Sequence, residues 1–148
     1  MTTYKLEFAE GYVKPALPGR DRWLEALRSD KYRQGSNALL RNGFYCCLGV
    51  LCSIQGRPRD ERQRAVGFDN NFDVLNTDNP LYSHLSSTGD FPPGVNLSIN
   101  EEDGVEENTT NLAGCNDGNL TFLQIAEIIE AVWADAPHNW STMRNPIL

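Results

Sequence analysis

The chain has 148 residues, 40% hydrophobic and 22% charged, a composition typical of a globular protein large enough to bury its own core. No apolar stretch is long enough to cross a membrane, and the N-terminus lacks the charged and apolar regions of a signal peptide, so we expect a cytoplasmic protein with reduced cysteines. The net charge of −7 argues against non-specific binding to nucleic acid.

The charge is unevenly distributed along the chain. Residues 20–64 contain ten Lys and Arg against five Asp and Glu, whereas residues 65–148 contain one Arg against thirteen acids. The acidic half argues against non-specific binding of nucleic acid over the whole surface, whereas the basic third could hold one anionic ligand.

The first part of the chain predicts a strand, a helix and a hairpin. Residues 1–20 predict an extended entry segment with a short strand around Tyr4–Phe8. Asp21 stands at an N-cap position before an apolar stripe at helical spacing, and this helix should end near residues 29–30. Residues 32–36 predict a turn, and a brief strand at 38–40 is followed by Asn42-Gly43, a hairpin-type turn.

The segment Phe44–Ile54 is apolar almost all round, so periodicity alone does not separate a buried helix from a buried strand. Apolar residues at helical spacing favour a helix, which Gly56 and Pro58 should end. Further on, Val95, Leu97 and Ile99 alternate with polar residues and predict a half-buried strand, followed by a turn at 101–104 and a partner strand at 105–111.

The last predicted element is a helix from about residue 122 to 134, closed by Pro137. Thr121 and Gln124 form a capping box, and Leu120 and Ile125 are placed as a hydrophobic staple. Together these elements predict an α+β fold: a single compact domain over residues 1–148, with a few helices packed on a small antiparallel sheet and a tail at 137–148.

Three of the four cysteines, Cys46, Cys47 and Cys52, fall within seven residues of the apolar segment. Adjacent cysteines point in different directions, and no Cys-x-x-Cys spacing occurs, so a zinc site is disfavoured. Apolar neighbours would raise a thiol pKa, which disfavours a nucleophile. We therefore predict buried core residues, with no metal, no cofactor and no catalytic residue.

The basic segment 28–34 combines a cation, a hydroxyl, a phenol and an amide. Such groups suit a planar anionic ligand, since Arg binds phosphate, Tyr stacks and Gln reads a base or sugar edge. The alternative is a solvated surface turn. Near the last helix, Asn116 could place a polar group beside a helix N-terminus, where anions are favoured. The candidate ligand-binding residues are Arg28, Ser29, Tyr32, Gln34, Arg41 and Asn116.

Three blocks of the sequence carry a family resemblance: residues 23–34 with Ala-Leu-Arg-Ser and Tyr-x-Gln, residues 44–52 with Cys-Cys-Leu-Gly-Val-Leu-Cys, and residues 116–130. They resemble a family of small, uncharacterised bacteriophage and prophage proteins. Residues 90–93 look like the Leu-Pro-Pro element of that family, with Phe in place of Leu, and Cys115 stands where an aliphatic residue is usual. The resemblance implies a phage protein that acts in the host cytoplasm, with no established activity to carry over.

These observations predict a non-enzymatic phage accessory protein, a counter-defence binding module that sequesters an anionic nucleotide-type small molecule. One alternative is an acidic mimic of nucleic acid that inhibits a host or defence protein, and another is a cysteine- or metal-dependent enzyme. The expected partners are the anionic ligand or a host protein, with no membrane, little role for nucleic acid, and homo-oligomers allowed.

Overall fold

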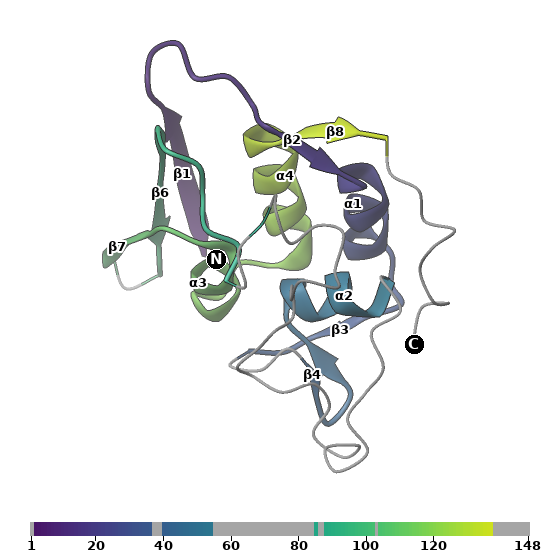
Figure 1. Cartoon of the computed structure of the whole chain (residues 1–148). Helices are drawn as coiled ribbons and strands as arrows, with labels where there is room; N and C mark the ends of the chain where they lie inside the picture. Colours follow the sequence, from purple (N-terminus) through teal and green to yellow (C-terminus); the bar gives the residue numbers. More distant parts are fainter. Residues whose placement is uncertain (1, 37–39, 55–84, 86–87, 103, 138–148) are drawn as a thin grey trace.

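The computed structural model describes residues 2–36, 40–54, 85, 88–102 and 104–137. Within them the chain forms helices α1 (Arg20–Arg28), α2 (Cys47–Ile54), α3 (Leu112–Asp117) and α4 (Phe122–Val132). The strands are β1 (Thr3–Phe8), β2 (Ala16–Pro18), β3 (Arg33–Gln34), β4 (Leu40–Arg41), β5 (Phe44–Tyr45), β6 (Val95–Asn100), β7 (Glu106–Thr109) and β8 (Ala134–Ala136). The result is a compact α+β fold, as the sequence predicted, with the helices beside a small antiparallel sheet (Figure 1).

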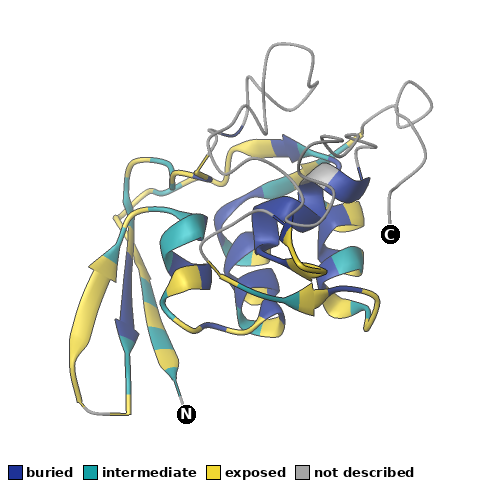
Figure 2. Cartoon of the chain, turned by 90° about the horizontal axis from the view of Figure 1, so that it is seen from below, coloured by how far each residue is buried: buried dark blue, intermediate teal, exposed yellow. Residues whose placement is uncertain are grey.

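The antiparallel sheet has the order β1-β6-β7. The strand expected from alternation at 95–99 is present as β6, and its expected partner is present as β7. The strand expected around Tyr4–Phe8 is β1, which pairs with β6 from Thr3↔Asn100 to Phe8↔Val95. Leu97 and Ile99 of the central strand are buried, whereas β7 is almost wholly exposed. Figure 2 shows this gradient, from a dark blue β6 to a yellow β7.

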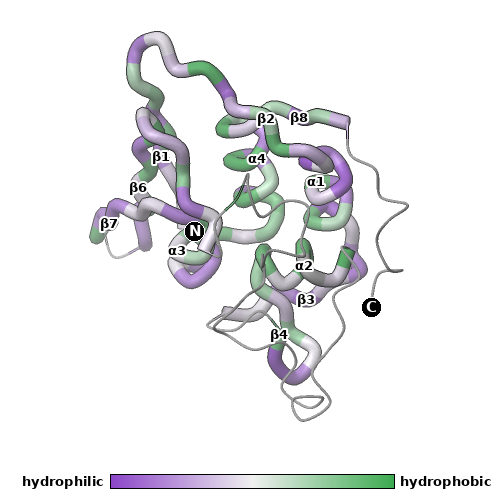
Figure 3. Tube along the Cα trace, viewed as in Figure 1, coloured by the Kyte–Doolittle hydropathy of each residue, from purple (hydrophilic) through white to green (hydrophobic). Residues whose placement is uncertain are grey.

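The helices enclose the core. α1 packs on α4 and α2, and its stripe of Trp23, Leu24 and Leu27 is buried, as predicted. The indole N–H of Trp23 donates to the carbonyl of Cys47 at 3.0 Å, so the largest buried side chain of α1 is anchored to the start of α2. Hydrophobic stretches lie along α2 and α4, and hydrophilic ones along the outer side of α1 (Figure 3).

Both ends of α4 are capped. The capping box at Thr121 and Gln124 is present, and Leu120 and Ile125 are fully buried. The helix ends at Val132, two residues earlier than predicted, because β8 follows and pairs in parallel with β2. At this end Tyr12 Oη donates to the Val132 carbonyl at 2.7 Å and Arg20 donates to the Trp133 carbonyl at 2.6 Å, so side chains more than a hundred residues away satisfy the terminal carbonyls.

Three local predictions are corrected. The N-cap of α1 is Gly19, with φ of 79°, and not Asp21, because the side chain of Asp135 in β8 accepts the Asp21 N–H at 3.0 Å. Arg33–Gln34 is a strand within the predicted turn, since it pairs in parallel with β5. The same pairing shortens the predicted 44–54 helix, which starts at Cys47. The Asn42-Gly43 hairpin turn is confirmed, both residues having positive φ.

One helix was missed altogether. α3 occupies Leu112–Asp117, between the strand predicted to end at 111 and the helix predicted to begin at about 122, where no helix was predicted. Asn111 caps it, its side chain accepting the Gly114 N–H at 2.7 Å, and Leu112 and Cys115 are buried on its inner face. The predicted stop at Gly56 and Pro58, the side chain of Cys52, and all of the predicted tail after Pro137 lie outside the described residues.

Candidate ligand-binding site

Two surface pockets are lined by residues of the basic segment. The first, here called the α1 pocket, has a volume of about 240 Å³ and is lined by Arg22, Glu25, Ala26, Ser29, Lys31, Tyr32 and Ile54. The second, the α4 pocket, has a volume of about 290 Å³ and is lined by Gln34, Gly35, Ser36, Asn116, Asn119, Leu120 and Thr121. The predicted ligand-binding residues are thus divided between two places.

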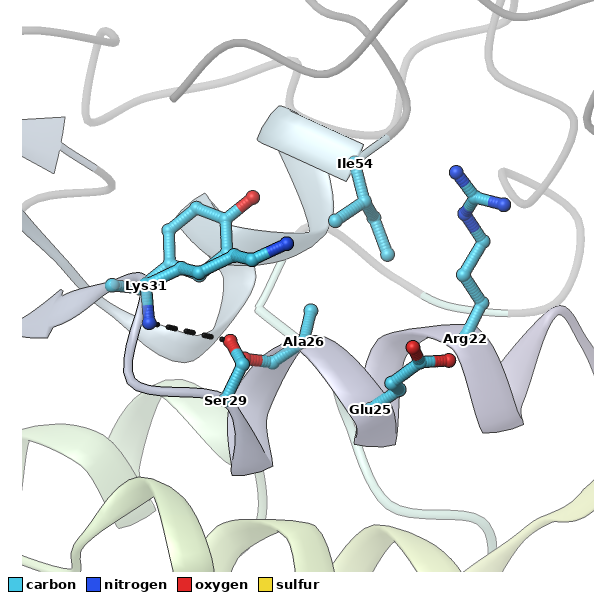
Figure 4. A pocket seen from close by; sticks show the side chains of 7 residues that line it. Arg22, Glu25, Ala26, Ser29, Lys31 and Ile54 are labelled. Atoms are coloured by element: carbon cyan, nitrogen blue, oxygen red, sulfur yellow. Dashed lines mark hydrogen bonds between the residues drawn. The ribbon is translucent and has the colours of Figure 1, made fainter.

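The α1 pocket is built on one face of a helix. Its lining residues from α1 and the following Ser29 are spaced at i, i+3, i+4 and i+7, the spacing that brings side chains to one face. Ile54, the last residue of α2, closes the pocket from above (Figure 4). In this view Arg22 and Lys31 stand at opposite sides, with Ala26 between them.

Tyr32 forms a rigid wall of the α1 pocket. Only 8% of the residue is exposed, its hydroxyl donates to Ser53 Oγ at 3.2 Å, and its ring packs edge-on against Tyr45 with centroids 4.9 Å apart. Burial raises the pKa of Tyr32, although its hydrogen bond with Ser53 opposes the shift. The phenol therefore stays neutral and fixed, and it offers an aromatic surface rather than a charge.

The charged groups of this pocket are exposed. Arg22 and Lys31 supply two positive charges and Glu25 one negative charge, all on side chains open to solvent. The balance favours an anion, while the carboxylate offers an acceptor for hydroxyl or amino groups of the same ligand. Because the charges are exposed, the attraction should weaken as the salt concentration rises.

Two of the predicted cations lie elsewhere. Arg28 forms an ion pair with Glu130 of α4 at 3.3 Å, and Arg41 is exposed on the β4–β5 hairpin opposite Phe44. Neither lines the α1 pocket or the α4 pocket. Ser29 does line the α1 pocket, with its hydroxyl donating to the Ala26 carbonyl at 2.7 Å.

Gln34 and Asn116 are brought together, but they bind each other and the backbone. Gln34 Nε2 donates to Asn116 Oδ1 at 3.1 Å and to the Leu120 carbonyl at 2.7 Å, and its Oε1 accepts the Phe122 N–H at 2.9 Å. Asn116, only 2% exposed, donates to the Gly35 carbonyl at 2.6 Å and accepts the Cys47 N–H at 3.2 Å. This pair, here called the amide hub, joins β3, α2, α3 and α4.

Cys46, Cys47 and Cys115 are free and buried, which agrees with the prediction that they pack as core residues. Burial raises the pKa of Cys46 to about 11 and that of Cys115 to about 12, and it raises the pKa of Cys47 well above its ordinary value. These thiols stay protonated and lack the nucleophilic form. Among the residues that the structure describes, no three His, Cys, Asp or Glu side chains come close enough to hold a metal ion.

Sequence reasoning did not select five residues that line the α1 pocket, namely Arg22, Glu25, Ala26, Lys31 and Ile54, although Lys31 lies within the basic segment 28–34. The spacing of Arg22, Glu25 and Ser29 on one helical face was readable from the sequence. Ile54 was not, because its position at the pocket depends on how α2 crosses α1.

A family model described as a domain of unknown function, DUF8296, matches residues 19–133. The chain belongs to this family. The match begins just before α1 and ends just after α4, so it includes both pockets and the amide hub. Comparisons with curated proteins and with solved structures each gave no significant match. Within the described part of the chain, no helix has the length and apolarity needed to span a membrane.

Proposed function

We propose that this protein is a non-enzymatic binding module that sequesters an anionic, nucleotide-type small molecule in the α1 pocket. The observation that carries the proposal is the convergence of Arg22 and Lys31 on one hollow whose wall is the fixed ring of Tyr32. Cations suit phosphate groups, and an aromatic wall suits a planar base. The cations proposed to bind the ligand are therefore Arg22 and Lys31, and not Arg28 and Arg41 as the sequence suggested.

The size of the pocket limits the ligand. A volume of about 240 Å³ lies below the range of about 300–1,000 Å³ that encloses a drug-sized molecule. We therefore expect the pocket to enclose a nucleoside monophosphate or one nucleotide of a larger ligand, with the remainder in solvent. The resemblance to phage proteins supports action in the cytoplasm of an infected host, where removal of a nucleotide signal would counter a defence system.

Isothermal titration calorimetry with a panel of cyclic and ADP-ribose-type nucleotides tests the proposal. We expect one ligand class to bind, and the double variant Arg22→Ala/Lys31→Ala to weaken binding at least about tenfold, since each charge-assisted contact contributes roughly 1.5–3 kcal/mol. The matched control is Arg28→Ala/Arg41→Ala, which removes two exposed cations outside the pocket. Binding that the control abolishes, or a complete absence of binding, would refute the assignment.

A second candidate function is supported by a separate observation. The β6–β7 hairpin exposes Glu102, Glu106 and Glu107 on adjoining positions, which supports a mimic of nucleic acid directed at a basic host or defence protein. In other described parts of the chain acids lie beside bases, as in the Arg28–Glu130 and Arg20–Asp21 pairs. A pull-down that recovers a basic nuclease or polymerase subunit, released by salt and lost on charge reversal of the hairpin, would favour this candidate.

A further inference from the structure

The outer edge of β1 has no neighbouring strand among the described residues. β1 lies at one edge of the β1-β6-β7 sheet, and Ala9 N donates to the Gly94 carbonyl at 2.8 Å just beyond the last pair of the ladder. Backbone groups in an antiparallel pair alternate between facing the neighbour and facing away. Thr3, Lys5 and Glu7 therefore point their backbone groups at β6, while those of Tyr4, Leu6 and Phe8 point away from the sheet.

These outward groups make no backbone pairing within the part of the chain that the structure describes. Among the described residues, none donates to or accepts from the backbone N–H and C=O groups of Tyr4, Leu6 and Phe8 on that side. The free edge stops at Thr2, whose carbonyl accepts from Gln124 of α4 at 2.9 Å. Unpartnered backbone groups must be hydrated, and the side chains of Tyr4 and Leu6 are only half-buried, in contrast to Leu97 and Ile99 on β6.

The side chains on this edge form a self-complementary pattern. Lys5 and Glu7 lie on the outer face of the sheet, 66% and 61% exposed at their side chains, with Lys5 Nζ 3.1 Å from Glu7 Oε1. Leu6 lies between them, and Tyr4 and Phe8 follow at equal distances on either side of Leu6. From Tyr4 to Phe8 the order of side chains is therefore aromatic, cation, leucine, anion, aromatic.

We propose that a second copy of this chain pairs with β1 at this edge, antiparallel and about a two-fold axis at Leu6, to give a continuous six-stranded sheet. Leu6 then faces Leu6 of the other copy, Tyr4 faces Phe8, and Lys5 faces Glu7. All three outward residues of each strand form hydrogen-bonded pairs, and the charged residues fall in the closer, non-hydrogen-bonded pairs. Such an isologous contact is the commonest way in which identical chains associate.

The charges select this register. Moving the axis by one residue in either direction places Lys5 opposite Lys5 or Glu7 opposite Glu7, and like charges directly opposite each other destabilise a strand pair. The two-fold at Leu6 replaces both repulsions with attractions. Phe8, 40% exposed and stacked on Tyr12 at 4.9 Å, gains a second aromatic neighbour in Tyr4 of the other copy.

Analytical ultracentrifugation of the full chain over the micromolar range tests this pairing. We expect a concentration-dependent dimer of twice 16.6 kDa. Lys5→Glu and Glu7→Lys each place like charges at both contacts, so each should raise the dimer dissociation constant by roughly tenfold or more. The double variant Lys5→Glu/Glu7→Lys restores complementarity, as does an equimolar mixture of the two single variants, which should form a heterodimer.

Both side chains are exposed and on the solvent face, so circular dichroism and thermal unfolding should show unchanged folding of every variant. Recovery of the dimer in the double variant and in the mixture would support the two-fold at Leu6. A protein that remains a monomer throughout, or a dimer that the single reversals leave unchanged, would overturn the proposal, and neither result bears on nucleotide binding in the α1 pocket.

Discussion

The two ends of α2 differ in the burial of the polar groups around them. At its start, Cys47 is fully buried, its N–H bonded to Asn116, its carbonyl to Trp23 and its thiol 3.7 Å from the Leu112 carbonyl. At its other end, Ile54 borders a pocket where Arg22, Glu25 and Lys31 are open to solvent. The residues with the most reactive chemistry in the sequence are thus enclosed, while an apparently ordinary helix face lines the cavity.

This difference shows that residue type is a poor guide to chemical availability. A thiol or an amide acts on a ligand only when it is exposed and when its hydrogen-bonding groups are not already engaged. The amides of the hub at the start of α2 are bonded to each other and to the backbone, whereas the side chains of Arg22 and Lys31 in the α1 pocket are exposed to solvent. If the first end of α2 is structural and the second is functional, substitutions at the first should change stability and substitutions at the second should change ligand binding.

The largest expected effect is at the amide hub. Asn116→Leu should lower the free energy of unfolding by about 4 kcal/mol, because it removes the partner of the buried Cys47 N–H and of the part-buried Gly35 carbonyl. Urea unfolding measures it. Asn108→Ala, an exposed asparagine of β7, is the control and should stay within about 0.5 kcal/mol. A mild effect of Asn116→Leu would show that the hub is dispensable for stability.

Because its thiols are buried, the folded protein should lose stability at alkaline pH. Since burial raises the pKa of Cys46 from 9.0 to about 11, the folded state retains a proton that the unfolded state loses, so stability is complete below pH 9 and falls as the pH rises from about 9 to 11. The loss from this thiol is about 1.4 kcal/mol per pH unit. Urea unfolding at a series of pH values measures it, and Cys46→Ala should give a shallower decline. Equal slopes for the two proteins would contradict the enclosed state of Cys46.

A smaller effect is expected where α4 begins, beside the hub. Thr121→Ala removes the side-chain acceptor of the Gln124 N–H, which lies at 3.2 Å, and should cost about 1 kcal/mol. Thermal and urea unfolding provide the measurement. Thr110→Ala, at an exposed position outside any helix, should have no comparable effect. An unchanged midpoint for Thr121→Ala would mean that packing alone holds this end.

The smallest effect is expected at Arg28. Its ion pair with Glu130 is exposed on both sides, so Arg28→Ala should change the free energy of unfolding by less than about 0.5 kcal/mol. Nucleotide affinity should also be unchanged, because Arg28 does not line the α1 pocket. If calorimetry showed a loss of binding for Arg28→Ala alone, the ligand site would have to be moved to the α1–α4 surface.

Much of the fold was readable from local patterns. The capping box at Thr121, the alternation at 95–99, the apolar stripe of α1 and the Asn42-Gly43 turn each depend on near neighbours, and each was predicted correctly. The misplaced N-cap of α1 has a different origin. Asp21 has the preferred residue type, but Asp135, 114 residues away, accepts the N–H in its place.

The candidate site was less predictable for the same reason. Of the six residues chosen by chemistry, Ser29 and Tyr32 line the α1 pocket, Gln34 and Asn116 form the amide hub and line the α4 pocket, and Arg28 and Arg41 line neither. The partner of Gln34 lies 82 residues away along the chain. No local pattern predicts which amides will satisfy each other.

The sequence by itself determined α1, α4 and the β6–β7 hairpin, the α+β class and the burial of Cys46 and Cys47, because helix caps, alternation and apolar runs act over a few residues. Only the tertiary structure decided which polar side chains remain available to a ligand. That depends on how distant segments pack, since Asn116 is buried and bonded to Gly35 and Cys47, whereas the side chains of Arg22 and Lys31 line a pocket and are exposed to solvent.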